Sequence, residues 1–300
     1  MTDKVKAGYV SIVGKPNVGK STLLNQLLEQ KISITSKKRQ TTRNNIIGIK
    51  TDEEQRAQIV FVDTPGMHLG QDSAINRYMN RTAASALDDV DVIVFVVDRD
   101  TFNHEDKAVA EKLANAKCPV VVAINKIDRL NQVNDILPHV KMLSDWLPNA
   151  EFIPVSALKA DNLKALNELL FDKMPESPTY IYPEDQITDR SMRFLAAEIV
   201  REKVVRLTGA ELPYQSAVEI EEFKDEGHIL RISALVLVER EGQKRIVIGD
   251  AGERIKQVGI DARRDMEALF ECKVMLSIWV KVKSGWSDDD RALRSLGLDD

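Results

Sequence analysis

Residues 14–21, GKPNVGKS, have the spacing G-x-x-x-x-G-K-S of a loop that binds nucleotide phosphates. The glycines let backbone N–H groups close around phosphate oxygens, and the N-terminus of the helix that follows adds a partial positive charge. In this pattern Lys20 reaches the β- and γ-phosphate oxygens, and Ser21 ligates Mg²⁺. The other predicted contacts of this P-loop are Gly14, Asn17, Val18, Gly19 and Thr22. The alternative is a glycine-rich turn that holds no nucleotide, so other motifs must decide.

The tetrapeptide Asp63-Thr64-Pro65-Gly66 follows an apolar run that is typical of a strand. At that position Asp63 can hold Mg²⁺ through a water, and the Gly66 N–H can point at the γ-phosphate. The next residue is Met67, whose thioether cannot position the attacking water as a glutamine does in Ras-type GTPases. His68 is an alternative general base, although a histidine after a turn is usually only solvated. If the chain hydrolyses a nucleotide, another group must therefore replace the glutamine.

The motif Asn125-Lys126-Ile127-Asp128 follows another apolar run and identifies the base. A carboxylate at Asp128 can accept hydrogen bonds from guanine N1–H and from the 2-amino group, whereas adenine offers neither donor. A site built in this way rejects the analogue that lacks the group by roughly 10⁴ to 10⁵. Ser156 and Ala157 are predicted to offer a backbone N–H to guanine O6. These motifs favour GTP and disfavour the alternative of an ATP-using P-loop kinase.

The basic and polar segment 37–43, KKRQTTR, lies between the P-loop helix and the next predicted strand. A threonine there can bind Mg²⁺ only while a γ-phosphate is present, so the segment is ordered in the GTP state and released after hydrolysis. Thr42 is the preferred residue and Thr41 the alternative. The alternative to a Mg²⁺-binding segment is a solvated charged loop. Most of the other side chains of residues 37–43 are expected to be solvated in either case.

These motifs need strands that deliver them to one place. The first half alternates apolar runs with polar helical patterns, which is typical of a βα-wound parallel sheet. The predicted strands are residues 8–13, 46–50, 58–62, 92–97, 120–124 and 152–155, and the predicted helices are residues 20–29, 73–88, 104–116 and 162–172. Asn103 precedes an acidic first turn and is the expected N-cap of the third helix. The expected fold is an α/β P-loop GTPase domain with a mostly parallel six-stranded sheet and flanking helices.

Length and composition predict a globular chain with two domains. Of its 300 residues, 43% are apolar and 30% are charged, as in ordinary globular proteins. A chain of this length usually forms two domains. Residues 174–188 carry three prolines and no apolar period, so the boundary is placed there. We expect a GTPase domain over residues 1–175, a linker over 176–188 and a second domain with a C-terminal tail over 189–300. The second domain is predicted as a helix (190–207), two strands (215–222 and 229–239), a short strand (245–248), a helical pair (253–270) and a last strand (273–283).

The same composition argues against several classes of protein. The longest apolar runs are far shorter than the roughly 20 residues that span a bilayer, and the N-terminal MTDKVKAGYV lacks the apolar region of a signal peptide. Cys118 and Cys272 show no metal-binding spacing and are expected to be small core residues of a cytoplasmic protein. A formal net charge of −5 weakly disfavours nucleic-acid binding over the whole surface but permits local basic patches.

With these motifs in place, the chain resembles the Era family of GTPases along its whole length. The nucleotide motifs indicate only a GTPase, and the second half carries the specific part of the resemblance. The matching segments are Asp189-Arg190-Ser191, residues 209–214 (GAELPY), residues 238–244 (VEREGQK) and residues 279–286 (WVKVKSGW). The resemblance implies a C-terminal type II KH domain, an α+β RNA-binding module. It also implies binding to the 3′ end of 16S rRNA and the 30S subunit, a role in small-subunit assembly that is coupled to growth, a monomer, and peripheral association with the inner membrane.

The resemblance further suggests what replaces the glutamine. In related GTPases an apolar residue follows the DTPG turn, and an asparagine of the P-loop helps to bind a K⁺ ion. The matching residue is Asn17, whose K⁺ would compensate charge between the phosphates much as an arginine finger does. The alternative is that Asn17 serves only the geometry of the turn. The expected catalytic residues are therefore Lys20, Thr42, Gly66 and Asn17, with GTP or GDP, Mg²⁺ and K⁺ as cofactors and slow, K⁺-stimulated hydrolysis.

In a KH domain the RNA-binding loop is G-x-x-G, which corresponds here to Gly249-Asp250-Ala251-Gly252. Such a loop clamps about four nucleotides of a single strand because its small residues allow close backbone approach. Asp250 and Glu253 place acids where phosphates should lie, so affinity must come from nearby bases and from stacking. The expected contacts are Lys244, Arg254, Lys256, Trp279, Lys281 and Lys283, with a core position as the alternative for Trp279. The rival function is a protein-interaction scaffold whose KH fold binds no RNA, and Asp250 is its best support.

Overall fold

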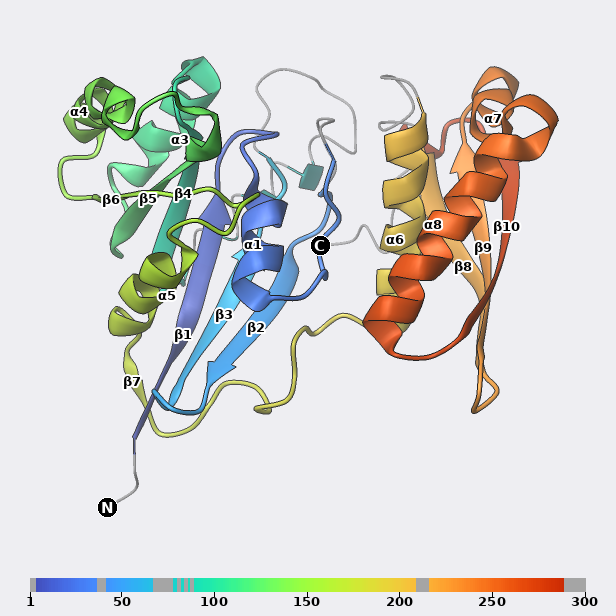
Figure 1. Cartoon of the computed structure of the whole chain (residues 1–300), viewed down its shortest axis with the longest axis horizontal. Coiled ribbons are helices and arrows are strands. Elements are labelled where there is room, and N and C mark those ends of the chain that lie inside the picture. The colour runs from blue at the N-terminus through green and yellow to red at the C-terminus, as the bar shows by residue number, and fades with distance from the viewer. Residues whose placement is uncertain are drawn as a thin grey trace. The chain divides into compact units, whose positions relative to one another are not determined.

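The computed structural model describes residues 4–36, 42–66, 78–79, 82–83, 86, 89–208 and 216–288. The chain divides into two compact units, whose elements are drawn in Figure 1. The first unit consists of the described residues of Met1–Ser33, Asn44–Gln71 and Met79–Asp189. The second consists of those of Ile34–Arg43, Asp72–Tyr78 and Arg190–Asp300.

The first unit is built on the mostly parallel sheet that the sequence predicts. Its strands are β1 (Val5–Val13), β2 (Ile46–Asp52), β3 (Ala57–Asp63), β4 (Val92–Asp98), β5 (Val120–Asn125) and β6 (Glu151–Pro154). They lie in the order β2-β3-β1-β4-β5-β6, and β2 runs antiparallel to β3 while the other neighbours are parallel. A two-residue strand, β7 (Glu176–Ser177), pairs antiparallel with β1. The central strand β4 is buried from Val92 to Val97, as is typical of a parallel sheet covered on both faces.

The carboxyl ends of the parallel strands bring the predicted motifs to one edge of this sheet. β1 ends at Val13, just before the P-loop, and β3 ends at Asp63. β4 ends at Asp98 and β5 ends at Asn125. Ligands of open α/β sheets bind at this edge. The fold therefore gathers the P-loop, the DTPG turn and the NKID motif.

The helices of the first unit are α1 (Lys20–Leu28), α3 (His104–Leu113), α4 (Leu137–Trp146) and α5 (Leu163–Asp172). Asn103 caps α3 as predicted, because its side chain accepts from the N–H groups of Glu105 and Asp106. Helix α4 was not predicted; its Leu143 is buried and its other side chains are at least partly exposed. This helix begins after Ile136, which makes no side-chain cap, so the sequence lacks the usual capping signal of a helix start. The expected helix at 73–88 lies mostly outside the described residues.

The second unit has the order helix, strand, strand, helix, helix, strand of a type II KH domain. Its elements are α6 (Met192–Leu207), β8 (Ser216–Asp225), β9 (Leu230–Val238), α7 (Glu241–Ile248), α8 (Glu253–Phe270) and β10 (Val274–Val282). The sheet order is β10-β9-β8, with β9 antiparallel to β8 and parallel to β10. α6 and α8 pack on the same face of this sheet, where Val200 and Ala262 share a core with Val236.

Residues 245–248 are helical, so the short strand predicted there is wrong. They form the second half of α7. The run Ile246-Val247-Ile248 favours a strand locally, but Gln243 Oε1 accepts from the N–H groups of Glu239 and Arg240, at 2.9 and 3.0 Å, and so stabilises a helix start. The G-x-x-G loop therefore joins two helices.

No helix in the described part of the chain is long and apolar enough to cross a membrane. Cys118 and Cys272 are free cysteines of intermediate burial. Cys118 packs against the core around β4 and β5, and Cys272 packs against the core of the second unit.

Candidate nucleotide site and RNA-binding loop

The P-loop connects β1 to α1 and needs its glycines for close packing. A Cβ atom at Gly14 would lie 2.4 Å from the Val96 carbonyl oxygen, and one at Gly19 would lie 2.3 Å from Asn125 Nδ2. Gly19 is also the N-cap of α1, with a left-handed φ of 104°. The loop can therefore lie against β4 and the NKID motif only because both positions are glycine.

Lys20 begins α1 and is buried. Its ammonium donates to the carbonyl oxygens of Gly14 and Lys15, each at 3.0 Å, so the side chain turns back over its own loop. Burial lowers the pKa of Lys20 to about 8, and the Asp63 carboxylate opposes this shift. The ammonium therefore lies beside the loop backbone, where a role in phosphate binding requires it.

Ser21 and Asp63, two of the predicted Mg²⁺ ligands, lie together. Ser21 Oγ donates to Asp63 Oδ2 at 2.7 Å, and Ser33 Oγ donates to the same oxygen at 2.8 Å. Asp63 Oδ1 is buried and has no hydrogen-bond partner among the described residues. Burial raises the pKa of Asp63, while Lys20 acts in the opposite direction. A buried carboxylate oxygen next to a hydroxyl is an oxygen donor set that suits a hard cation, so these residues fit Mg²⁺.

The DTPG turn after β3 packs directly on the P-loop. Thr64 Oγ1 donates to the Ile12 carbonyl oxygen at 2.9 Å. A Cβ atom at Gly66 would lie 2.9 Å from the Pro16 nitrogen, so a side chain there would push the turn away. Pro65 is buried, as are its neighbours Thr64 and Gly66. A bond from the Gly66 N–H to the γ-phosphate stays a prediction, and Met67 and His68 lie outside the described residues.

Asn125 joins the NKID motif to the P-loop. Its Nδ2 donates to the Val18 carbonyl oxygen at 2.8 Å. Its Oδ1 accepts from the N–H groups of Lys126 and Ala157, at 2.8 and 2.9 Å. Three predicted motifs therefore meet at one amide, whose role is to position the backbone around it.

Asp128 and Ser156 form the next contact of this group. Ser156 Oγ donates to Asp128 Oδ1 at 2.6 Å, which orients the carboxylate and leaves Oδ2 for other donors. Asp128 is exposed in the described structure. The geometry suits an acceptor for the two guanine donors, and these base contacts stay predictions.

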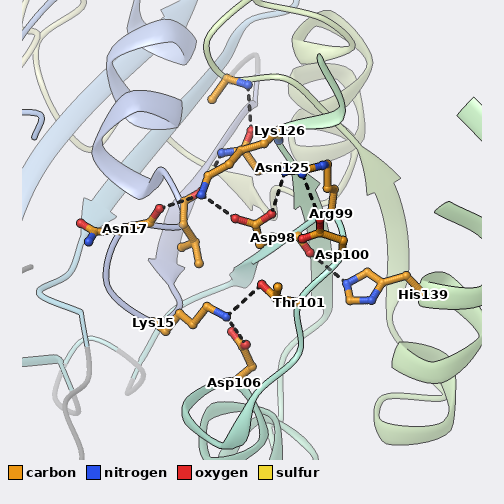
Figure 2. A network of polar contacts seen from close by, with 12 residues as sticks. Lys15, Asn17, Asp98, Arg99, Asp100, Thr101, Asp106, Asn125, Lys126 and His139 are labelled. Atoms are coloured by element: carbon orange, nitrogen blue, oxygen red, sulfur yellow. Dashed lines mark hydrogen bonds and ion pairs between the residues drawn. The ribbon is translucent and has the colours of Figure 1, made fainter. Parts of the chain in front are cut away.

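Three residues that the nucleotide motifs do not mark also belong to this network: Lys15, Asp98 and Asp106. Figure 2 shows Lys15 bonded to Asp106, and Lys126 bonded to both Asp98 and the Asn17 carbonyl oxygen. Asp98 ends β4 at the ligand edge of the sheet, which is a signal that could have identified it. Asp106 pairs with a residue 91 positions away in the sequence, so no local pattern could have identified it.

The affinity for GDP is expected to fall as the pH rises through 8. With a pKa of about 8, Lys20 loses its proton above that pH, whereas phosphate oxygens around the ammonium keep it charged in the complex. Binding then takes up a proton, so linkage makes the dissociation constant about fourfold larger at pH 8.5 than at pH 7. Calorimetry in two buffers of different ionisation enthalpy measures the uptake. Lys20→Arg stays charged and should lose this dependence; the same dependence in that variant would assign the proton to another group.

Thr42 belongs to a segment of which only part is described. It is buried, and it lies in Ile34–Arg43, which groups with the second unit. Residues 37–41, including Thr41, lie outside the described residues. The role of Thr42 as a Mg²⁺ ligand stays a prediction.

In the second unit, the G-x-x-G loop forms a short 3₁₀ turn, Asp250–Gly252, between α7 and α8. Gly249, Ala251 and Gly252 have φ values of 73°, 49° and 80°. A Cβ atom at Gly249 would lie 2.7 Å from Arg254 Cβ, so this glycine allows α8 to begin close to the end of α7. Asp250 and Ala251 are exposed. The loop offers a compact backbone with an acid on its surface.

The basic residues near this loop differ in their surroundings. Lys256 is exposed, and Lys244 is partly buried. The Arg254 guanidinium donates to the Ile246 carbonyl oxygen and so ties α8 to α7. Arg254 therefore supports the shape of the loop, and Lys256 is the more accessible cation.

Trp279, Lys281 and Lys283 form a separate group. Trp279 is 61% exposed, which excludes the alternative of a core position. Its neighbours Ile278 and Val280 pack against the core that contains α6 and α8. Successive side chains of a strand point to opposite faces, so Trp279 and Lys281 lie on the open face of the sheet. The predicted RNA contacts therefore fall into two groups, one at the α7–α8 turn and one on this open face.

Two models of known protein families match parts of this chain. A family model described as a 50S ribosome-binding GTPase matches residues 9–126, and one described as a KH domain matches residues 211–287. The GTPase Era of Ectopseudomonas mendocina is 62% identical over 292 residues, which are 97% of each chain. The GTPase Era of Pseudomonas aeruginosa strain LESB58 is 61% identical over 295 residues, which are 98% of this chain and 96% of that one.

Two solved structures match the fold over nearly the full length. A variant of Aquifex aeolicus Era bound to GDP·AlF₄⁻ has a TM-score of 0.93 and 39% identity, and the match covers 98% of this chain and 99% of that one. Era in complex with MgGDPNP and nucleotides 1506–1542 of 16S ribosomal RNA has a TM-score of 0.93, 40% identity and the same coverage.

Proposed function

This chain belongs to the Era family of GTPases, and on that premise we propose that it binds the 3′ end of 16S rRNA and acts as a GTP-dependent switch in assembly of the 30S ribosomal subunit. It is a GTPase. The observation that carries the proposal is the meeting of the P-loop, the DTPG turn and the NKID motif in a chain that continues into a KH fold. The Era complex with MgGDPNP and a 16S rRNA fragment supports the same ligands here.

In the proposed reaction a water attacks the γ-phosphorus, the bond to the β-phosphate oxygen breaks, and GDP and phosphate leave. Lys20 compensates the charge on the β- and γ-phosphate oxygens. Ser21, Asp63 and Thr42 would hold Mg²⁺, which supplies positive charge to those oxygens when bound. The 2.7 Å contact between Ser21 and Asp63 supports their shared role.

We assign the remaining charge compensation to a K⁺ ion held by Asn17. The Asn17 carbonyl oxygen accepts from Lys126 at 3.0 Å, which leaves the side-chain oxygen as the ligand atom of this residue. Asn17 is exposed and has a φ of 65°, a conformation in which asparagine is tolerated better than most residues. The turn geometry and the cation role are therefore compatible in one residue.

The test of the RNA part is binding of a fluorescent RNA with the 16S 3′-terminal sequence to the full chain. Fluorescence anisotropy should give tighter binding with GDPNP than with GDP, and an RNA of the same composition in scrambled order should bind more weakly. Equal affinities for all four combinations would contradict both the sequence preference and the coupling to GTP.

Truncating Trp279 is expected to weaken RNA binding by roughly 1 to 3 kcal/mol, the contribution of stacking one base on an aromatic ring. The indole is 61% exposed, so Trp279→Ala should leave the fold intact. Anisotropy of the same RNA measures the loss. Met192→Ala, which also truncates an exposed apolar side chain of this unit, is the matched control. Equal affinity for Trp279→Ala and the wild type would remove the open sheet face from the RNA site.

The exposed acid of the G-x-x-G loop favours the second candidate function, a scaffold that binds protein and no RNA. If RNA contacts this loop, Asp250→Lys should tighten binding and steepen the dependence of log K on log salt by about one. Glu221→Lys makes the same charge change at another exposed position of the unit. An identical response in both variants would mean that RNA does not contact the loop. The scaffold would be preferred if the unsubstituted chain and both variants failed to bind the RNA.

We place this activity in the cytoplasm and propose a monomer as the working form. Peripheral association with the inner membrane is carried over from the family resemblance alone. Flotation of the full chain with vesicles that contain anionic lipid tests it, and the absence of the protein from the vesicle fraction would contradict it.

A further inference from the structure

The side chain of Lys15 has no assigned role in the P-loop motif, yet it makes one of the most buried ion pairs in the described structure. Its Nζ lies 2.5 Å from Asp106 Oδ2 and 3.4 Å from Thr101 Oγ1. Lys15 is 8% exposed and Asp106 is fully buried. Figure 2 shows the ammonium reaching from the P-loop to these two residues. The second residue of the P-loop is therefore bonded to the first turn of α3 and lies close to Thr101, which precedes that helix.

Asp106 is held rigidly at the start of α3. Its Oδ2 also accepts from the Asn103 N–H at 2.9 Å, while Asn103 Oδ1 accepts from the N–H groups of Glu105 and Asp106. This reciprocal capping box fixes both the helix start and the carboxylate. A lysine bonded to such a carboxylate has little freedom to move.

A second set of contacts links the end of β4 to Asn17, which follows Pro16 in the P-loop. Asp98 Oδ2 lies 2.5 Å from Lys126 Nζ, and that ammonium also donates to the Asn17 carbonyl oxygen at 3.0 Å. The Asp98 carbonyl oxygen is itself within 2.9 Å of His139 Nε2 in α4. Residues 98 and 106 thus hold Asn17 and Lys15 respectively, one through Lys126 and one directly.

We propose that residues 98–106 form a brace that holds the P-loop backbone in its phosphate-binding shape, and that the Lys15–Asp106 pair sets the rate at which the nucleotide is released. The proposal rests on the proposed function, in which this loop binds phosphates through its backbone N–H groups. Backbone donors bind tightly when they are already arranged for the ligand, and changes in affinity at one site appear mainly in the dissociation rate. Lys15 and Asp106 are positioning residues, because they act through the loop.

If the Lys15–Asp106 pair only stabilised the fold, its removal would change nucleotide release only as far as it changed the stability of the protein. Replacing both members of a buried ion pair by apolar residues of similar volume is often neutral for stability, whereas removing one member leaves an unpaired buried charge. The double variant Lys15→Met with Asp106→Leu can therefore separate stability from positioning. Lys15→Arg keeps the charge and the donors and serves as the conservative variant.

The experiment is stopped-flow release of a fluorescent GDP from the full chain, chased with excess unlabelled GDP. We expect release to be roughly tenfold faster in Lys15→Met, Asp106→Asn and the double variant, with association rates close to that of the wild type. Lys15→Arg should release GDP at nearly the wild-type rate. Glu176→Gln, which breaks the exposed 2.6 Å pair with Lys4, is the matched control and should not change release.

A double variant that melts at the wild-type temperature and releases GDP at the wild-type rate would overturn the proposal. The proposal would also be overturned if the release rate of every variant, including the double variant, rose only in proportion to the fall in its melting temperature. Guanine-nucleotide binding, on which the proposed function rests, is tested separately with the unsubstituted chain, which should retain labelled GDP in the presence of excess ATP.

Discussion

Replacing Asp128 by asparagine is expected to weaken GTP and GDP binding by roughly a thousandfold or more. Ser156 Oγ already donates to Asp128 Oδ1 at 2.6 Å, so the carboxylate is oriented with Oδ2 available to the guanine N1–H and 2-amino donors. An amide nitrogen in place of one oxygen turns an acceptor into a donor that faces other donors. Titration of a fluorescent GDP against the wild type and the variant measures the loss.

Two controls make this result specific to the base. Asp145→Asn makes the same chemical change at an exposed aspartate of α4 and should bind GDP like the wild type. Xanthosine diphosphate carries a carbonyl oxygen where guanine has the 2-amino group, so it can accept from the new amide and should recover part of the affinity for Asp128→Asn. Unchanged GDP binding by this variant would mean that the base is recognised elsewhere.

GTP turnover is expected to be faster in KCl than in NaCl of the same concentration, by about tenfold or more, because charge compensation at the phosphates is a large term in phosphoryl transfer. The side-chain oxygen of Asn17 is the proposed ligand of the ion, since Lys126 takes its carbonyl oxygen. Asn17→Gly removes the side chain while tolerating the φ of 65° at this position, so it should abolish the difference between the two salts. Release of phosphate under multiple turnover measures the rate.

The control for this experiment is Asn162→Gly. Asn162 also has a positive φ, of 59°, so the change of backbone freedom is the same, and stimulation by K⁺ should persist. Repeating the measurement with the 16S 3′-terminal RNA separates two groups that could replace the missing glutamine. Stimulation by both K⁺ and RNA would indicate a cation and a partner; equal rates in KCl and NaCl would remove the cation from the mechanism.

The sheet of the first unit and its motifs follow from the sequence because their signals are local. The buried run Val92 to Val97 has the length and composition of a central parallel strand, and the structure has β4 there. At residues 245–248 the local signal is misleading, because β-branched residues favour a strand but the capping contact of Gln243 stabilises a helix. Helix α4 was not predicted, because Ile136 at its N-cap offers no capping side chain and the sequence lacks the usual capping signal of a helix start.

The nucleotide chemistry and the strands of the first unit follow from the amino-acid sequence alone, because the spacing of the P-loop, DTPG and NKID motifs and the strand-length apolar runs are properties of short segments. The pairing of Lys15 with Asp106 and of Lys126 with Asp98 becomes visible only in the folded chain, because these residues lie 91 and 28 positions apart in the sequence. The exposure of Trp279 on the open face of a sheet whose other face is covered by α6 and α8 is likewise visible only there. Pairings of this kind depend on which strand ends and helix starts come together at a sheet edge, and burial depends on which face another element covers. Neither the pairing of distant side chains nor the exposure of Trp279 can be predicted from the spacing of neighbouring residues.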